Sequence, residues 1–263
     1  MQHDLTLLTS LTVTAGRDKS GTEEAEDVVF RPGEISALLG PTGSGKSRFL
    51  SDIESMANGD TPTGRKLLLN GVEPDSDERF SLQGTLVAQL SQNMNFVLDM
   101  RVGDFIFTHA ESRGVSDARE AALRVMEEAN RLAGEPFHPE NHLAQLSGGQ
   151  SRALMIADTA LLSWSPVILI DEIENAGVDK RRALELLVKS DKIIVIATHD
   201  PVLALSADRR LVFQNGGVKG SFQRTGREEE LLGELLEMEL KFSRVREALR
   251  SGVAPVLEPV HPG

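Results

Sequence analysis

The feature that most constrains the fold is a glycine-rich stretch, GPTGSGKS, at residues 40–47. It follows an apolar run, EISALL, and precedes a stretch of helical character. Its residues fit the pattern of a glycine, four residues, Gly-Lys and then Ser or Thr. Glycines in such a loop let backbone N–H groups turn inward around phosphate oxygens, and the following helix adds partial positive charge at its N-terminus. The stretch therefore predicts a strand–loop–helix unit that binds phosphate groups.

The side chains of this loop indicate a nucleoside triphosphate with Mg²⁺. We expect Lys46 to reach the β- and γ-phosphates and the Ser47 hydroxyl to ligate Mg²⁺. A flexible glycine turn before a helix is the alternative interpretation, but it does not explain Lys-Ser at this spacing after a strand. The remaining candidate phosphate-binding residues are Gly40, Pro41, Thr42, Gly43, Ser44 and Gly45.

A second candidate site follows the apolar run VILI, where Asp171 and Glu172 stand. In open α/β sheets, ligands collect at the carboxyl ends of the strands. An Asp at that edge can hold Mg²⁺ through water, and the adjacent Glu can orient or activate an attacking water. Many strands simply end in polar residues, and it is the pairing with the phosphate-binding loop that favours the functional interpretation.

Size and charge limit the classes of function. The chain has 263 residues, enough for one large domain or a core with a subdomain. Its formal charge of −12 argues against a nucleic-acid-binding surface, which relies on clustered Lys and Arg. It has no cysteine, which excludes disulfides and thiolate metal sites and suits a reducing cytoplasm. We see no signal peptide and no apolar run of about eighteen residues, so we expect no direct membrane insertion.

The pattern along the chain predicts an α/β fold with a mostly parallel core sheet. Two continuous apolar runs, PVILIDE and KIIVIATHD, are typical of strands buried on both faces, and a helical stretch, DKRRALELLVKS, separates them. Residues 5–14 roughly alternate apolar and polar, and together with GRKLLLNG and GTLVAQLSQ they suggest a small antiparallel layer. We expect the acidic loop RDKSGTEEAED to be a solvated hairpin connection.

Residues 117–133 predict a helix, with Ser116 as a candidate N-cap and Gly134 as the stop. Its apolar positions share one face at helical spacing. They are Ala118, Ala122, Val125, Ala129 and Leu132.

A long helix is also expected at about 227–250, before a loose tail. Its apolar residues repeat at steps of four and three. They are Leu231, Leu235, Met238, Phe242, Val245 and Leu249. We expect this stripe to pack on the protein's own core or on a dimer mate. The alternative is a docking helix for a separate partner.

The order of the motifs carries a family resemblance. LSGGQ, at residues 146–150, stands between the phosphate-binding loop and VILIDE, and a His follows the next buried strand. This order resembles the ATP-binding cassette (ABC) ATPases over roughly residues 5–220, and LSGGQ matches that family's signature without a mismatch. The resemblance implies an ABC ATPase domain at 1–220 with antiparallel β and helical subdomains, the helical one at about 100–150. Residues 221–263 would form a C-terminal helical extension and tail.

In that family two cassettes pack head to tail, with each ATP between the P-loop of one and the signature loop of the other. The resemblance implies that Ser147, Gly148 and Gly149 contact the γ-phosphate across the dimer, at the start of the next helix. Gln150 completes this loop. Asp179 resembles the aspartate of the loop that crosses the dimer interface.

The resemblance assigns catalytic roles to two further residues. Gln92 resembles the Q-loop glutamine, which would sense Mg²⁺ and the attacking water. His199 resembles the switch histidine, which would bond the γ-phosphate and help to place the catalytic Glu172.

The sequence departs from the family pattern at three points. The segment before the P-loop has no aromatic residue to stack on adenine, and Arg17 could stack on the base instead. Ile173 stands where transporter cassettes often have Pro, and the stretch to Asp179 is one residue longer than usual. The helix between Asp179 and His199 is short.

The implied activity is hydrolysis of ATP by a cassette that dimerises around the nucleotide. We favour the ATPase subunit of an ABC transporter, paired with a second cassette and separate membrane permease subunits at the inner face of the membrane. The alternative is a soluble ABC ATPase that acts on a cytosolic protein or complex. A nucleotide-binding regulator with little turnover is the third class, and the intact Glu172 and His199 argue against it.

Overall fold

The computed structural model describes residues 8–91, 96, 99–171 and 177–254. Its main sheet has six strands in the order β5-β6-β7-β3-β8-β9. The first five are parallel, and β9 runs antiparallel to β8. Strands β6 and β7 are buried on both faces because helices cover the sheet on either side, as their unbroken apolar runs predict. The strands are β3 (Ile35–Leu39), β5 (Val87–Ser91), β6 (Val167–Asp171), β7 (Ile193–Ala197), β8 (Arg209–Gln214) and β9 (Gly217–Gln223).

A second sheet is antiparallel and has the order β2-β1-β4. Its strands are β1 (Leu11–Val13), β2 (Val28–Phe30) and β4 (Leu67–Leu69). The expected antiparallel layer is therefore present, but the assignment of GTLVAQLSQ to it is wrong. That segment forms β5, which pairs in parallel with β6 at the edge of the main sheet. The correction matters for function, because it brings the end of β5 to the same edge as the phosphate-binding loop.

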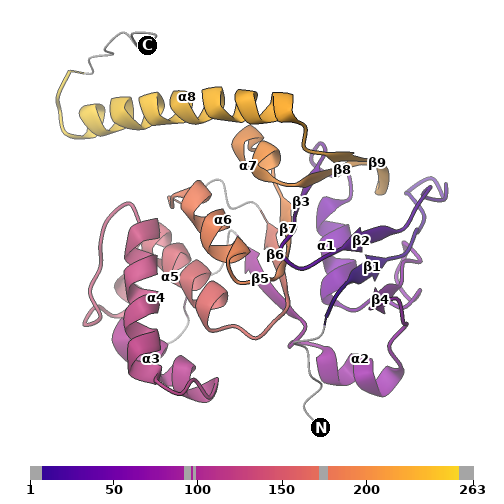
Figure 1. The fold of residues 1–263 in the computed structure, drawn as a ribbon, viewed down its shortest axis with the longest axis horizontal. Helices are drawn as coiled ribbons and strands as arrows, with labels where there is room; N and C mark the ends of the chain where they lie inside the picture. The colour runs from indigo at the N-terminus through magenta and orange to yellow at the C-terminus, as the bar shows by residue number, and fades with distance from the viewer. Residues whose placement is uncertain (1–7, 92–95, 97–98, 172–176, 255–263) are drawn as a thin grey trace.

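Nine helical segments surround the sheets in the part of the chain that the structure describes (Figure 1). They are α1 (Lys46–Glu54), α2 (Ser76–Leu82), α3 (Val102–Ser112), α4 (Ala118–Leu132), the 3₁₀ segment η2 (Leu143–Gln145), α5 (Gly148–Leu161), α6 (Lys180–Val188), α7 (Pro201–Ser206) and α8 (Gly226–Arg250). Helix α1 and the antiparallel sheet share one core with one face of the main sheet, and helices α3 to α6 pack into a second core. The fold is that of a P-loop NTPase, with an α/β core, an antiparallel β layer and a helical region. The domain boundaries at residues 220 and 221 stay a prediction.

Helix α4 forms where the sequence predicts it, with a different N-cap. The side chain of Asp117, not Ser116, accepts a 2.9 Å hydrogen bond from the backbone N–H of Glu120. A carboxylate at this position satisfies an unpaired N–H and complements the helix dipole. Val125, Ala129 and Leu132 are buried, as the apolar face predicts, and the helix ends just before Gly134.

The acidic loop at residues 17–27 is largely exposed, as expected, but two of its carboxylates are not solvated. Asp18 is buried and accepts hydrogen bonds from Ser20 and Thr22, so its pKa is well below the usual range. The Glu24 side chain is almost fully buried and pairs with the buried Arg65. Charged residues in a loop indicate solvation only when the fold offers them no buried partner. Here the partner of Glu24 is Arg65, which comes from a distant segment.

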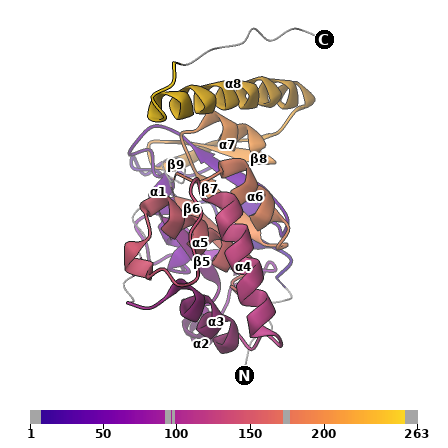
Figure 2. The same cartoon turned by 90° about the vertical axis from the view of Figure 1, so that its left-hand side faces the viewer.

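Helix α8 lies across one end of the molecule, next to α7, and both views show it apart from helices α3 to α5 (Figures 1 and 2). At the helical region, the guanidinium of Arg113, just after α3, lies 5.8 Å from the ring centroid of Trp164, in the connection between α5 and β6. No helix among the described residues is both long enough and apolar enough to cross a membrane.

Candidate nucleotide-binding site

The candidate site is built at the carboxyl edge of the parallel strands. In the sheet register, Leu38 of β3 pairs with Ala197 of β7, and Asp171 of β6 pairs with both Ala197 and Ser91 of β5. The phosphate-binding loop leaves β3 at this edge, and His199 follows β7. The fold therefore brings together segments that the sequence separates by more than a hundred residues, at the place where α/β sheets bind ligands.

Two predicted site residues, Gln92 and Glu172, lie outside the described residues. Each directly follows a described residue at this edge, Ser91 and Asp171 respectively.

The loop needs glycine for two separate reasons. Gly40, Gly43 and Gly45 have φ angles of 146°, 77° and 110°, which residues with a Cβ rarely adopt. A Cβ on Gly45 would also lie 2.7 Å from the Cα of Gly216, in the turn between β8 and β9. That turn holds the loop through a 2.7 Å hydrogen bond from the Gly216 N–H to the Ser44 carbonyl. The conformation of the loop is therefore fixed by its glycines and by its contact with the β8–β9 turn.

Lys46 spans the inside of the loop. Its ammonium donates to the Gly40 carbonyl at 2.6 Å and the Pro41 carbonyl at 3.2 Å, and it lies 3.5 Å from Nε2 of His199. Lys46 is buried, whereas Ser47 and Thr42 are exposed at the mouth of the loop. A buried ammonium beside exposed hydroxyls and inward-turned N–H groups can bind a polyphosphate.

A buried ion-pair network supports the helix that follows the loop. The Arg65 side chain is fully buried and pairs with Asp52 of α1 at 3.0 Å and with Glu24 at 2.6 Å. It also donates to the Gly216 carbonyl at 3.2 Å and lies over the ring of Phe49. Burial alone would raise the pKa of Glu24, but the hydrogen bonds from Arg65 and from backbone N–H groups lower it below its ordinary value. Arg65 thus fastens the antiparallel layer and the β8–β9 turn to the same helix.

Lys19 is a site residue that sequence reasoning missed. Its ammonium donates to the Gly43 carbonyl at 2.8 Å, and its backbone N–H donates to the Asn215 carbonyl at 2.8 Å. The predicted base-stacking residue, Arg17, is exposed and pairs with Glu23 at 3.7 Å. The only sequence signal for Lys19 is its position in the charged loop before the phosphate-binding loop, which we had assigned to solvent.

The LSGGQ segment forms the N-terminus of α5. Ser147 is the N-cap: its side chain accepts from the Gln150 N–H at 3.3 Å, and its own N–H donates to the Gln150 side chain at 2.9 Å. The Gln150 amide also donates to the Glu135 carbonyl at 3.3 Å. This reciprocal capping box fixes the loop, while Ser147 and Gly148 remain exposed at a helix N-terminus that can accept an anion.

Asp179 lies close to this loop in the fold. The backbone N–H of Asp179 donates to the Leu132 carbonyl at 3.0 Å, and Gly177 packs against Gly149. Its side chain caps α6 and is exposed. The signature-like loop and the segment before α6 therefore lie side by side within one chain.

Lys180, next to Asp179, connects α6 to α7 and α8. It is a second residue that we did not predict from the sequence. Its ammonium pairs with Asp200, which caps α7 directly after His199, and lies 3.4 Å from Glu239 of α8. Burial alone would lower the pKa of Lys180, but Asp200 and Glu239 raise it above its ordinary value. The lysine therefore stays charged and links the region of Asp179 to the region of His199.

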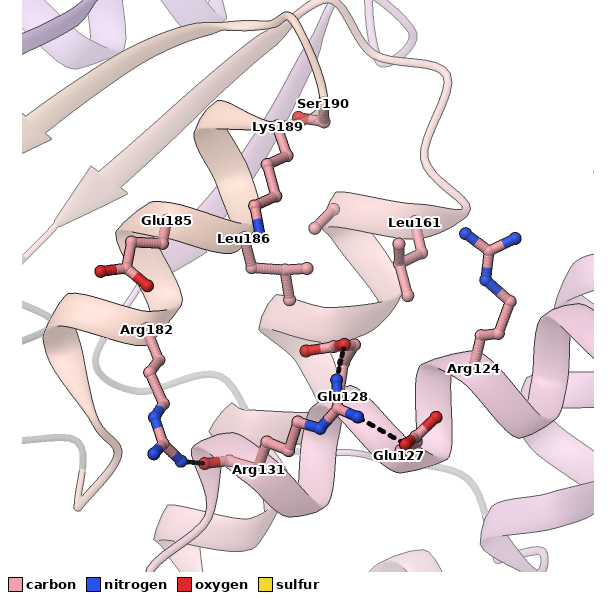
Figure 3. A pocket seen from close by; sticks show the side chains of 11 residues that line it. Arg124, Glu127, Glu128, Arg131, Leu161, Arg182, Glu185, Leu186, Lys189 and Ser190 are labelled. Atoms are coloured by element: carbon pink, nitrogen blue, oxygen red, sulfur yellow. Dashed lines mark hydrogen bonds and ion pairs between the residues drawn. The ribbon is translucent and has the colours of Figure 1, made fainter.

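A groove of about 580 Å³ lies away from this edge, between α4, α5 and α6 (Figure 3). Arg131 pairs there with both Glu127 and Glu128 at 2.5 Å. The charged side chains that line the groove are thus largely matched with one another. The phosphate-binding loop is therefore the better candidate for the nucleotide site. Among the described residues, no group of three or more His, Asp or Glu side chains is placed to hold a metal ion.

The parallel sheet, the preformed glycine loop and the polar residues that follow its strands define the class of protein: a P-loop ATPase. The family model described as ABC transporter matches residues 26–175. An uncharacterised ABC transporter ATP-binding protein of Methanocaldococcus jannaschii is 49% identical over 244 residues, which cover 92% of this chain and 93% of the relative. The chain belongs to the ABC transporter family, as one of its ATP-binding cassettes.

A further relative and two solved structures are also similar to this chain. The macrolide export ATP-binding/permease protein MacB of Brucella abortus is 28% identical over 202 residues, which cover 72% of this chain and 30% of that protein. The structure of cbiO1 from Clostridium perfringens, part of the ABC transporter complex cbiONQ, matches with a TM-score of 0.61 at 21% identity, over 92% of this chain and 96% of that one. A dimeric ATP-binding cassette bound to ADP and phosphate matches with a TM-score of 0.60 at 22% identity, over 82% of this chain and 99% of that one. At these identities the two structures support the fold.

Proposed function

We propose that this chain binds and hydrolyses ATP as half of a cassette dimer and that it powers a transporter with separate membrane subunits. The observation that carries the proposal is the convergence of the phosphate-binding loop, Asp171 and His199 at one sheet edge, with Lys46 and His199 already 3.5 Å apart. The helix start at Ser147–Gly149, with Ser147 and Gly148 exposed, supplies a second anion-binding surface, which faces out of the chain.

The donor set fits Mg²⁺. The Ser47 hydroxyl is exposed at the start of α1, and Asp171 stands at the end of β6, so hard oxygen ligands are offered at one edge of the sheet from two segments that β7 separates. Gln92 directly follows Ser91, which pairs with Asp171, and would complete the set. Bound there, Mg²⁺ would neutralise charge on the β- and γ-phosphates.

In the proposed mechanism, the loop of residues 40–47 binds the phosphates, and Lys46 exchanges its two carbonyl partners for β- and γ-phosphate oxygens. Glu172 accepts a hydrogen bond from the attacking water and orients it toward the γ-phosphorus. His199 donates to the γ-phosphate and holds Glu172 in place. The water oxygen bonds to the γ-phosphorus as the bond from that phosphorus to the β–γ bridging oxygen breaks, Glu172 accepts one proton of the water and passes it to solvent, and ADP and phosphate are released. Catalysis is mainly positioning and charge stabilisation.

The second copy completes the site. Its Ser147, Gly148 and Gly149 contact the γ-phosphate from the opposite side, with Gln150 holding the loop in shape, and Asp179 crosses the interface. Arg17 and Lys19 lie before the loop, where the base would be held, and a cation there can stack on a purine. ATP binding would close the dimer, and hydrolysis would reopen it.

The transporter role is favoured by two similar proteins: cbiO1, which is part of the ABC transporter complex cbiONQ, and MacB, a macrolide export ATP-binding/permease protein. The chain would then work at the inner face of a membrane through a permease. The alternative is a soluble ATPase that acts on a cytosolic protein. It is favoured by Ile173, which stands where transporter cassettes often have Pro.

The experiment uses Glu172→Gln as a trap. The variant should bind ATP, fail to hydrolyse it and accumulate as an ATP-dependent dimer. Tagged in its native cell, held with ATP and gently solubilised, it should co-purify with a multi-span membrane protein in near-equal amounts. Unchanged hydrolysis would remove Glu172 from the role assigned here. A soluble partner instead of a membrane protein would favour the alternative.

A further inference from the structure

Helix α8 exposes an apolar stripe to solvent. All of α8 is described, and none of its 25 residues is buried. The side chains of Leu231, Met238, Phe242 and Leu249 are 46%, 50%, 59% and 62% exposed. Large apolar residues gathered on one face in this way indicate a contact surface, whereas single exposed ones are ordinary. The expectation that the stripe packs on the protein's own core is therefore wrong for most of its residues.

The spacing of the stripe is that of a coiled-coil seam. Its residues follow one another at alternating steps of four and three, which is the a/d pattern of a heptad repeat. They are Leu231, Leu235, Met238, Phe242, Val245 and Leu249. The flank of the helix that carries Leu232 and Leu236 is partly covered, and α8 packs on α7. The seam thus lies beside the contact with α7 and is open to another helix.

We propose that α8 of a second copy of this chain covers the first four residues of the seam, Leu231, Leu235, Met238 and Phe242, in antiparallel orientation, so that the chain dimerises through α8 without nucleotide. Charges beside the seam favour this orientation. A parallel pair would set Glu234 against Glu239 and Lys241 against Arg246 of the other copy, in each case like charges. An antiparallel pair centred between Leu235 and Met238 sets Glu234 near Lys241 of the other copy, twice by symmetry.

The position of α8 in the fold is compatible with α8 of a second copy as its partner. Glu239, in the middle of the helix, lies 3.4 Å from the ammonium of Lys180, which follows Asp179. The proposed ATP-bound dimer places Asp179 at the interface between two cassettes, so α8 would run beside that interface. An antiparallel helix pair about a two-fold axis is self-complementary, as a symmetric cassette dimer also is. The placement of α8 beside that interface rests on the proposed function, whereas the seam itself does not.

Charge disfavours a membrane surface as the occupant. Helix α8 carries seven acidic and five basic residues. Helices that lie on anionic lipid surfaces are rich in Lys and Arg on the polar face.

The test measures the association state of the full chain without nucleotide, by sedimentation velocity over a range of concentrations. Wild type should be a dimer, and the double variant Met238→Glu, Phe242→Glu should be a monomer. Leu240→Glu is the matched control, because Leu240 is 61% exposed on the same helix but lies opposite the seam. It should remain a dimer. Circular dichroism and ATP binding should show that all variants are folded.

The charge pattern is tested by Glu234→Lys and Lys241→Glu. Each alone should weaken the dimer, and the two together should restore it. A monomeric wild type, an equal effect of Leu240→Glu, or binding of the wild type to anionic vesicles in place of dimerisation would each overturn the proposal.

A further variant separates this inference from the proposed function. When Glu172→Gln is added to the double seam variant, ATP should restore a dimer through the cassette faces. If Glu172→Gln with an intact α8 gains no ATP-dependent contact, the proposed ATP-bound dimer fails. The nucleotide-free measurement still decides the role of α8.

Discussion

The ammonium of Lys46 lies 3.5 Å from Nε2 of His199, although 153 residues separate them in the chain. One belongs to the loop after β3 and the other follows β7, and these two strands are neighbours in the sheet. A γ-phosphate bound by Lys46 would therefore come within reach of the imidazole.

His199→Ala should lower kcat by about 100-fold or more, because a donor to a charged transition state is lost. ATP affinity should change little, since Lys46 and the loop still bind the phosphates. Steady-state hydrolysis and equilibrium nucleotide binding measure the two effects separately. A variant with normal kcat would contradict the switch role of His199.

Ser147→Arg should block the ATP-dependent dimer and leave nucleotide binding by the single chain intact. Ser147 is exposed at the start of α5, so the larger side chain does not enter the core of its own chain. Loss of the capping box should cost about 1 kcal/mol of stability. Ser147→Asp, which keeps an N-cap, is the control for that cost. Disappearance of ATP binding itself in the Arg variant would show that the loop does not act across the dimer.

Arg65→Met should lower the free energy of unfolding by about 3–5 kcal/mol, because Asp52 and Glu24 are left buried without their cation. Urea unfolding of the variant measures this directly. Arg17→Met, which breaks only the exposed pair with Glu23, should cost less than about 1 kcal/mol. Equal losses in the two variants would mean that burial of the Arg65 network has no effect on stability.

Lys180→Met should lower kcat by about tenfold, equivalent to about 1.4 kcal/mol, and leave KM nearly unchanged. Its partner Asp200 caps α7 directly after His199, so removing the cation frees the segment that positions the imidazole. Lys180→Arg should restore most of the rate. Lys189→Met, at the exposed far end of α6, is the control and should behave as wild type. A fall in thermal stability with an unaltered kcat would reduce Lys180 to a purely structural residue.

Lys192 should make stability depend on pH in the alkaline range. Burial, and to a lesser degree the charge of Arg113, lowers the pKa of Lys192 to about 8 from an ordinary value of 10.5. Between these two pH values the unfolded chain holds a proton that the folded chain has released. The contribution of Lys192 to the free energy of unfolding should therefore rise with pH from about 8 to 10.5 and be constant below about 8.

Urea unfolding of wild type and Lys192→Gln between pH 7 and pH 10 checks this, because the difference between them cancels most other titrating groups. The Lys192 ammonium also donates to the Ser165 carbonyl at 2.9 Å, so the variant should be offset by a constant amount at low pH. A difference that does not vary with pH would contradict the lowered pKa.

The sequence predicts the chemistry of the site better than its surroundings. The phosphate-binding loop and the strands β6 and β7 follow from local patterns, because a glycine loop and fully buried strands need particular residues at short range. Gln92 and Glu172 lie outside the described residues, so their roles stay predictions.

Contacts between distant segments could not be predicted in the same way. Lys19 and Glu24 lie in a loop whose composition is that of a solvated connection, and their partners are Gly43 and Arg65. Strand β5 was assigned to the wrong sheet because its short pattern is compatible with either an edge strand of the parallel sheet or an antiparallel strand. Only the tertiary fold distinguishes these cases.

The contact between Arg113 and Trp164 gives the protein a built-in optical reporter. Trp164 is the single tryptophan, and the chain has no tyrosine, so its near-ultraviolet emission comes from one indole ring. Arg113 follows α3, whereas Trp164 precedes β6, so the contact links the helical region to a segment that leads into the sheet. Any rotation of α3 against the sheet would change the charge next to the indole and thus its emission wavelength. Unlabelled protein mixed with ATP in a stopped-flow fluorimeter would therefore display the rate of that rotation in real time.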